Sequence, residues 1–268
     1  MPLFYDQTGR SISLHSVPKS IVSLVPSQTE LLSDLGLGNE VSGITKFCVH
    51  PREWFNNKLR VGGTKTVSID IIRKLQPDLI IANKEENVKE QVQELALEFP
   101  VWVSDVNNLE DAYGMIGTIG EMVNRTRQAD ELITTILNEF AKLNEQVETG
   151  DRRLRAAYLI WKEPYMAAGG DTFINDMLMR CGFNNVFGSV NRYPTLNPEQ
   201  LNDDHKCDLV ILSSEPYPFR QKHVDELQQL MPDIKIMLAD GEMFSWYGSR
   251  LRLAPAYFRK FRELTTIY

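Results

Sequence analysis

Residues 124–150, "NRTRQADELITTILNEFAKLNEQVETG", decide how the chain is organised. Apolar side chains recur in this stretch at helical spacing, no Gly or Pro interrupts it, and Gly150 supplies a stop signal. The apolar positions are Ala129, Leu132, Ile133, Ile136, Leu137, Phe140 and Leu143. About 24 residues at about 1.5 Å each make a helix of about 36 Å, the width of a small domain. A flexible linker would be rich in Gly or Ser, so the segment predicts a long helix that joins two halves and allows only small motion between them.

On each side of this helix, apolar runs of strand length alternate with amphipathic segments of helix length. In the first half, strands are expected at 21–25, 41–44, 79–82 and 101–103, with helices near 28–35, 86–98 and 109–122. In the second half, strands are expected at 156–161, 209–212 and 234–238, with helices near 172–181, 223–230 and 249–264. Such alternation is typical of parallel sheets with helical crossovers. We predict an α/β protein with two Rossmann-like lobes of parallel strands, 1–123 and 151–268, joined by the helix 124–150.

Composition and charge exclude several classes of protein. The formal net charge of −7 and the pI near 5.3 argue against nucleic-acid binding, which needs a basic face. No apolar run approaches the roughly 20 residues needed to cross a bilayer. The first ten residues carry no secretory signal. We therefore expect a cytoplasmic protein if Met1 is the native start, and a periplasmic or lipid-anchored one if a leader has been removed.

The loop in "SLVPSQTELLSDLGLG", residues 23–38, lies between a strand and a helix, where nucleotide-binding folds hold phosphate. Ser27 and Glu30 fit a capping box, with Gly36 as a left-handed stop. A carboxylate at the helix N-terminus makes a poor phosphate host, and no Gly-x-Gly-x-x-Gly or Walker lysine is present. The phosphate hypothesis is rejected, and the loop is expected at the edge of a ligand crevice.

No catalytic constellation is legible. Three scattered cysteines, Cys48, Cys181 and Cys207, form neither a disulfide framework nor a zinc motif. Of the four histidines, His205 and His223 are expected at the surface. His50 lies on a loop after a strand, where it is either a packing residue or a ligand to a metal centre.

The loops after the strands are rich in aromatic and cationic side chains. In the first half these are Lys46, Phe47, His50, Thr64, Lys65 and Lys84, and in the second half Trp161, Lys162, Tyr165, Tyr193, Phe244, Trp246, Tyr247 and Arg250. Each of them alone could be a core residue or a solvated charge. Together they indicate a pocket for a large planar ligand with polar or acidic fringes, because loops that follow parallel strands meet at one edge.

Residues 20–51 and 60–87, with "GFNNVFGSVNRYPTLNPEQL" (182–201) and "DGEMFSWYGSR" (240–250), resemble the substrate-binding proteins of ABC importers for cobalamin, haem and iron–siderophores. This is the helical-backbone metal receptor superfamily, and the likeness is greatest to its cobalamin-binding members. The resemblance covers nearly the whole chain. It implies two Rossmann-like lobes bridged by one helix, with the ligand in the cleft between them.

The resemblance also implies roles for individual residues. Pocket aromatics would fall at Phe47, Trp161, Tyr165 and Tyr193, at Phe244 or Trp246, and His50 would join them. Glu199 matches one of the two surface glutamates that dock such proteins on a transporter. At the other position this chain has Leu59 and Arg60 instead of a glutamate.

The leading hypothesis is a non-enzymatic, monomeric protein without a cofactor of its own, which binds a corrinoid such as cobalamin and has an ABC transporter permease as its partner. A haem or ferric-siderophore binding protein is an alternative, with Tyr165 or Tyr193 as haem ligand or with Lys and Arg pairing with an anionic chelate. A cytoplasmic protein that delivers or senses a corrinoid is another. A two-lobed α/β enzyme is the third, although no base, nucleophile or phosphate loop supports it.

Overall fold

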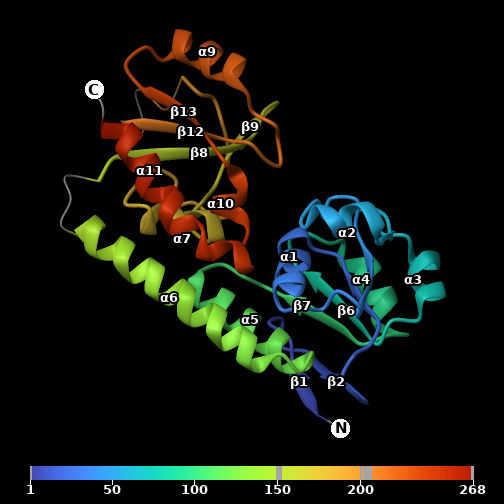
Figure 1. The fold of residues 1–268 in the computed structure, drawn as a ribbon. Coiled ribbons are helices and arrows are strands. Elements are labelled where there is room, and N and C mark those ends of the chain that lie inside the picture. Colours follow the sequence, from blue (N-terminus) through green and yellow to red (C-terminus); the bar gives the residue numbers. More distant parts are fainter. Residues whose placement is uncertain (1, 149–152, 200, 202–206, 267–268) are drawn as a thin grey trace. The chain divides into compact units, whose positions relative to one another are not determined.

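The computed structural model describes residues 2–148, 153–199, 201 and 207–266. The chain divides into two compact units, whose elements are labelled in Figure 1. Unit 1 comprises Met1–Val106, Glu110–Thr135 and Tyr247–Arg250, and unit 2 comprises Asn107–Leu109, Ile136–Trp246 and Leu251–Tyr268. Each unit has its own sheet and helices, as the predicted α/β fold class requires.

Unit 1 is built on a five-stranded parallel sheet with the strand order β5-β4-β3-β6-β7. The strands are β3 (Ile21–Ser23), β4 (Val41–Ile44), β5 (Leu59–Arg60), β6 (Leu79–Asn83) and β7 (Val101–Ser104). Strands β3, β6 and β7 are buried along their whole length, which explains why they read as continuous apolar runs. The four strands predicted in this half are confirmed, and β5 is an addition that the sequence did not signal.

Four helices of unit 1 connect these parallel strands, and a fifth follows the last strand, β7. They are α1 (Pro26–Asp34), α2 (Arg52–Asn57), α3 (Ile69–Leu75), α4 (Lys89–Ala96) and α5 (Leu109–Met122). The helices expected near 28–35, 86–98 and 109–122 are confirmed, whereas α2 and α3 come from segments without a prediction. An N-terminal hairpin, β1 (Leu3–Tyr5) with β2 (Ser11–Ser13), buries Phe4 and Ile12.

The predicted capping box at the start of α1 is wrong. The helix begins at Pro26, its N-cap is Val25, and no side chain caps it. Pro at the first helical position needs no hydrogen-bond partner, so the helix can start one residue before Ser27. The Glu30 carboxylate instead accepts hydrogen bonds from Arg250. Gly36 ends the helix region with φ of 79°, as predicted.

Unit 2 contains a mixed sheet with the order β11-β9-β8-β12-β13, and β10 also pairs with β8. The strands are β8 (Arg155–Trp161), β9 (Tyr165–Ala167), β10 (Asn184–Asn185), β11 (Thr195–Leu196), β12 (Leu209–Ser213) and β13 (Lys235–Ala239). The three predicted strands β8, β12 and β13 are parallel, as expected. Strands β9 and β11 extend this parallel core with antiparallel pairs. The turn from β8 to β9 spans only residues 162–164, which is too short for a parallel crossover.

The helices of unit 2 follow the sequence pattern with two differences, an unpredicted short helix at Gly241–Ser245 and a division of the final helix. These helices are α7 (Phe173–Arg180), α9 (Gln221–Leu230), α10 (Gly241–Ser245) and α11 (Ala254–Thr266); the 3-10 helix η1 (Ser249–Arg252), which precedes α11, is divided between the two units. The single final helix expected near 249–264 is divided into η1 and α11. Pro255 is the second residue of α11, a position where proline is tolerated because its missing N–H has no partner there.

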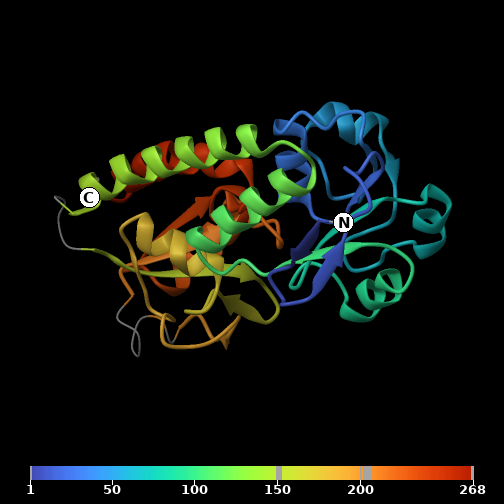
Figure 2. The ribbon, with the colours of Figure 1, turned by 90° about the horizontal axis from the view of Figure 1, so that it is seen from below.

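The segment that decides the organisation forms one unbroken helix, α6 (Thr126–Glu148), in both views of the ribbon (Figures 1 and 2). Its 23 residues extend about 35 Å. The buried side chains follow helical spacing: Ala129, Leu132, Ile136, Phe140, Leu143 and Val147. Leu137, counted with the apolar positions, is 48% exposed. The predicted helix is confirmed, while the predicted stop at Gly150 lies outside the described residues.

Among the helices of the described residues, none is both long enough and apolar enough to span a membrane.

Two neighbouring positions on α6 provide a test of its packing. Ile136 is fully buried, whereas Leu137 is half exposed. We expect Ile136→Ala to lower the free energy of unfolding by about 2–5 kcal/mol through a lost transfer term and a cavity. Leu137→Ala should cost less than about 1 kcal/mol. Urea unfolding followed by circular dichroism measures both, and equal losses would contradict this packing.

Candidate functional site

In unit 1, the loop after β4 presents an aromatic ring to solvent. The Thr45 hydroxyl lies 3.2 Å from the Cys48 thiol, the Cys48 N–H donates to the Thr45 carbonyl, and the Phe47 N–H donates to the Thr45 hydroxyl at 3.4 Å. This tight loop leaves Phe47 51% exposed, with the Lys46 ammonium 5.1 Å from its ring centroid. Burial raises the pKa of the Cys48 thiol, so Cys48 is a packing residue rather than a nucleophile.

The loop after β5 packs directly against Lys46 and Phe47. The Lys46 N–H donates to the Gly62 carbonyl at 2.8 Å, and a Cβ added at Gly63 would meet Lys46 and Phe47 side-chain atoms at 3.2 Å. Thr64 is buried, whereas Lys65 is exposed and donates to the Glu85 carbonyl. The structure therefore brings the predicted residues Lys46, Phe47, Thr64 and Lys65 to one edge of the sheet.

Two further predicted residues of unit 1 are differently placed. The Lys84 ammonium forms an ion pair with Asp105 at 2.5 Å. Arg250 makes a two-pronged ion pair with Glu30, at 2.9 and 2.7 Å, and both side chains are largely buried. Burial and pairing make this Arg250 guanidinium a structural cation of unit 1.

His50 is half-buried and precedes a cis peptide bond to Pro51. Across the described residues, no group of three or more His, Cys, Asp or Glu side chains is placed to hold a metal ion. His50 as a ligand to a metal centre stays a prediction.

In unit 2, aromatic side chains gather where β8 ends and where the chain leaves β12. We call Trp161, Tyr165, Tyr217, Phe219 and His223 the aromatic cluster. Ring centroids lie 5.7 Å apart for Trp161 and Tyr217, 4.7 Å for Tyr217 and Phe219, and 6.5 Å for the stacked Tyr165 and Phe219. Trp161 is 41% exposed at the margin of the cluster.

Two members of the aromatic cluster were missed by sequence reasoning. Tyr217 and Phe219 lie in "SSEPYPF", which directly follows the buried strand β12. The rule that singled out the other loops, aromatic residues after a buried strand, applies equally here. The signal was therefore present in the sequence.

The charges around the aromatic cluster are paired. The Lys162 ammonium contacts Glu226 at 2.6 Å and lies 6.0 Å from the Tyr165 ring centroid. Burial raises the pKa of Tyr165, against the lowering effect of Lys162. The prediction that His223 is a surface residue is wrong, because it is 3% exposed and its Nδ1 accepts the Arg220 N–H at 2.9 Å. Burial lowers the pKa of His223, which favours the neutral ring. His205 lies outside the described residues.

The remaining aromatic candidates of unit 2 are less exposed to solvent than Trp161. Phe244 is fully buried and its ring centroid lies 4.6 Å from that of Phe258 and 5.1 Å from that of Tyr158. Trp246 is 7% exposed, and its indole N–H donates to Glu215 at 2.8 Å. Tyr193 is half-buried, with the Arg192 guanidinium 5.5 Å from its ring centroid.

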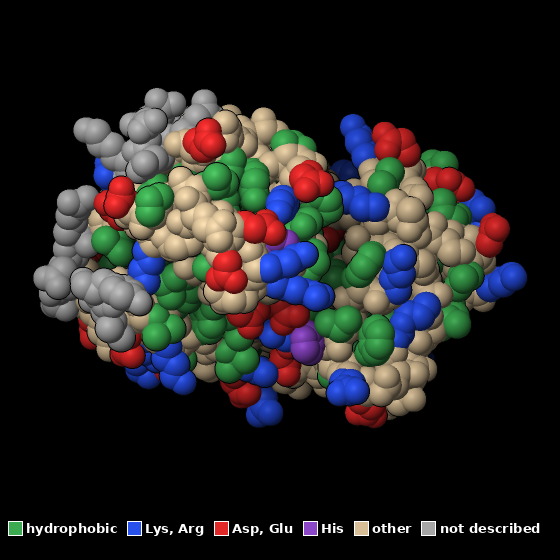
Figure 3. Space-filling view, turned by 90° about the horizontal axis from the view of Figure 1, so that it is seen from above, with side chains coloured by type: hydrophobic (Ala, Val, Ile, Leu, Met, Phe, Trp, Pro, Cys, Tyr) green, Lys and Arg blue, Asp and Glu red, His purple; other side chains and the backbone are tan. Residues whose placement is uncertain are grey.

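The residues at the two docking positions implied by the resemblance are accessible. Glu199 is exposed, and its N–H donates to the Asn197 side chain. Leu59 is 50% exposed, and the Arg60 guanidinium lies 4.4 Å from the Phe55 ring centroid. On the face seen in Figure 3, hydrophobic side chains reach the surface among Lys, Arg, Asp and Glu side chains.

A sequence profile of the periplasmic binding proteins matches residues 21–234. The chain belongs to the periplasmic binding protein family.

Individual relatives of this binding protein are distant. It is 28% identical over 181 residues to YvrC of Bacillus subtilis (strain 168), an uncharacterised ABC transporter substrate-binding lipoprotein, covering 65% of this chain and 57% of that protein. It is 24% identical over 244 residues to the vitamin B12-binding protein of Pectobacterium carotovorum subsp. carotovorum (strain PC1), covering 90% and 87% of the two chains. The aligned part thus spans little more than half of YvrC and most of the Pectobacterium protein.

The crystal structure of BtuF, the periplasmic vitamin B12 binding protein of Vibrio cholerae, shares the fold. The TM-score is 0.79 at 18% sequence identity, covering 94% of this chain and 99% of BtuF. This likeness confirms the two-lobed α/β fold class of the binding protein.

Glu215, which accepts the hydrogen bond from the Trp246 indole, predicts a pH dependence of the stability of the fold. Burial raises its pKa and neighbouring Glu242 adds to the rise, while hydrogen bonds from Ser245 and Trp246 oppose it. An acid whose folded-state pKa is raised stabilises the fold fully only below its unfolded pKa, and this stability is lost as the pH rises through the folded pKa. We expect Glu215→Gln to gain stability over the natural protein as the pH rises above the ordinary glutamate pKa of 4.5, because the amide carries no charge in the buried site.

The measurement is urea unfolding at a series of pH values. Glu121→Gln on the exposed face of α5 makes the same charge change and should show no such gain. If the stability of Glu215→Gln relative to the natural protein fell as the pH rises, the assigned direction of the Glu215 pKa would be contradicted.

Proposed function

We propose that this chain is a non-enzymatic binding protein that captures a corrinoid, such as cobalamin, or a related metal chelate for an ABC importer. The observation that carries the proposal is an exposed aromatic ring beside a cation at the carboxyl ends of strands in each unit. In unit 1 the exposed ring is Phe47, with the Lys46 ammonium over it. In unit 2 it is Trp161, at the margin of the aromatic cluster in which the Lys162 ammonium lies over the Tyr165 ring.

This combination suits a large ligand with a flat face and polar edges. An exposed ring offers apolar area that a bound macrocycle can cover, at little entropic cost because aromatic side chains have few rotatable bonds. Cations at the margin offer hydrogen bonds to amide, carboxylate or phosphate groups on the ligand. The vitamin B12-binding relatives support the choice of a corrinoid.

Haem with Tyr165 as its ligand is the less favoured alternative, whereas the half-buried Tyr193 stays a candidate haem ligand. Burial raises the pKa of Tyr165, so the phenolate that binds ferric iron would be costlier to form there. A ferric siderophore paired with cations remains the other chelate to be tested.

Titration calorimetry with cyanocobalamin, haemin and ferrichrome tests the proposal on the natural protein. We expect cyanocobalamin to bind, and the double variant Phe47→Ala with Trp161→Ala to weaken its binding more than about tenfold, at about 1–1.5 kcal/mol per ring. Tyr5→Ala removes a ring that is 65% exposed on β1, outside these loops, and serves as the control.

Each outcome has a defined consequence. Tighter binding of haemin or ferrichrome would replace the corrinoid with that chelate, and equal affinity of the double variant would reject the aromatic contacts. Chemical conversion of a bound compound would show an enzyme. Uptake of the ligand by the source cell that does not depend on this chain would reject the importer role and leave delivery or sensing.

A further inference from the structure

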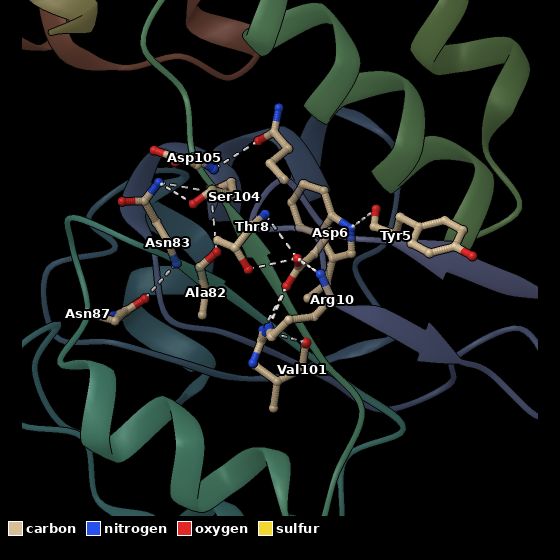
Figure 4. A network of polar contacts seen from close by, with 12 residues as sticks. Tyr5, Asp6, Thr8, Arg10, Ala82, Asn83, Asn87, Val101, Ser104 and Asp105 are labelled. Atoms are coloured by element: carbon tan, nitrogen blue, oxygen red, sulfur yellow. Dashed lines mark hydrogen bonds and ion pairs between the residues drawn. The ribbon is translucent and has the colours of Figure 1, made fainter. Parts of the chain in front are cut away.

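A buried polar cluster in unit 1 lies under the loops that carry the candidate ligand residues. We call Gln28, Asn83, Asn87 and Ser104 the amide cluster; their exposed fractions are 0%, 3%, 5% and 0%. Asn83 and Ser104 are the last residues of β6 and β7, and Figure 4 shows the contacts of Asn83 with Ser104 and with Asn87. Burying a polar side chain this deeply costs free energy of folding unless its donors and acceptors form hydrogen bonds.

Asn83 fixes the loop that follows its own strand. Its Oδ1 accepts the N–H groups of Glu85 and Glu86 at 2.8 and 2.9 Å. Its Nδ2 donates to the Ser104 carbonyl and hydroxyl at 3.1 and 2.9 Å. The start of the loop at 84–86 is therefore held to the neighbouring strand β7.

Asn87 joins three separate segments through one side chain. Its Oδ1 accepts the Asn83 N–H at 2.8 Å. Its Nδ2 donates to the Leu24 carbonyl at 3.3 Å, just after β3, and to the Thr64 carbonyl at 3.0 Å, in the loop after β5. These two bonds attach the loop after β5 to the centre of the sheet.

Gln28 extends the same cluster to helix α1. Its Nε2 donates to the Ser104 hydroxyl, and that hydroxyl donates to the Ala82 carbonyl at 3.2 Å. Helix α1 and strands β6 and β7 thus share one set of hydrogen bonds.

The attachment at Thr64 reaches the ligand loops directly. Gly62 and Gly63, which precede Thr64, contact Lys46 and Phe47 as described above, and Lys65 follows it. A displacement of the Thr64 backbone would therefore move or loosen residues from both loops. A loop that is ordered before binding does not have to be ordered by the ligand, which saves binding free energy.

We propose that Asn87 is a positioning residue for ligand binding: its amide holds the loop of residues 62–66 in the conformation that places Lys46, Phe47 and Lys65. This inference rests on the proposed function for its ligand, but the ordering of the loop can be measured without one.

Asn87→Asp is the sharpest variant because it keeps the size of the side chain and the acceptor for the Asn83 N–H. It replaces two N–H donors with a carboxylate oxygen that faces the carbonyls of Leu24 and Thr64. Protonation of the new carboxyl group restores one donor, so the defect should diminish at acid pH. Asn56→Asp, on the exposed surface of α2, introduces the same charge as a matched control.

Hydrogen exchange on the ligand-free protein is the first measurement. In Asn87→Asp at pH 7 we expect exchange at least about tenfold faster in peptides covering 62–66 and 84–87, with β3 and β6 unchanged. Partial recovery is expected near pH 4, after correction for the intrinsic exchange rate. Unchanged loops would overturn the proposal, and so would equal acceleration throughout unit 1, which would indicate a general packing role.

Calorimetry with cyanocobalamin, haemin and ferrichrome is the second measurement. We expect Asn87→Asp to weaken the probe that the natural protein binds by about tenfold at pH 7, and Asn56→Asp to leave it unchanged. Faster loop exchange with unchanged affinity would overturn the positioning role. If the natural protein binds none of the probes, the proposed function fails together with the ligand part of this inference, while exchange still decides whether Asn87 orders the loop.

Discussion

Parallel strand pairing is the constraint on which the rest of unit 1 depends. All five strands point the same way, so every loop that leaves a strand emerges at the same edge of the sheet. Segments far apart in the chain are thereby linked by hydrogen bonds at this edge. The loop after β5 accepts bonds from Lys46 on one side and from Asn87 on the other. The candidate ligand residues of unit 1 lie close together on short loops, because all these loops leave the same edge of the sheet.

The loops that follow the strands are stabilised in different ways in the two units. In unit 1 the buried amides of Asn83 and Asn87 hydrogen-bond to the backbone of the loops. In unit 2 aromatic rings pack on one another, from Trp161 at the surface to Phe219 and His223 in the interior. The first arrangement fixes backbone positions through hydrogen bonds, and the second builds a wall of apolar surface.

Membership of the periplasmic binding protein family agrees with this architecture, and individual residues depart from the implied pattern. Arg250 is paired with Glu30 and Phe244 is fully buried, so their contact with a ligand stays a prediction. At one of the two docking positions that the resemblance implies, the chain has Leu59 and Arg60 where a glutamate is expected. A family resemblance transfers the fold more reliably than the role of each side chain, because a role depends on neighbours that vary independently.

The sequence by itself determined the long helix α6 and the central parallel strands of both halves, with most of their longer helices. Burial on both faces of a strand, or along one face of a helix, leaves a direct signal in the sequence. The sequence also indicated the aromatic and cationic loops. Only the tertiary structure decided that Glu30 pairs with Arg250 instead of capping α1, that His223 is buried, and that Asn87 joins three segments of the chain. These outcomes depend on partners distant in the chain, and local periodicity carries no information about them.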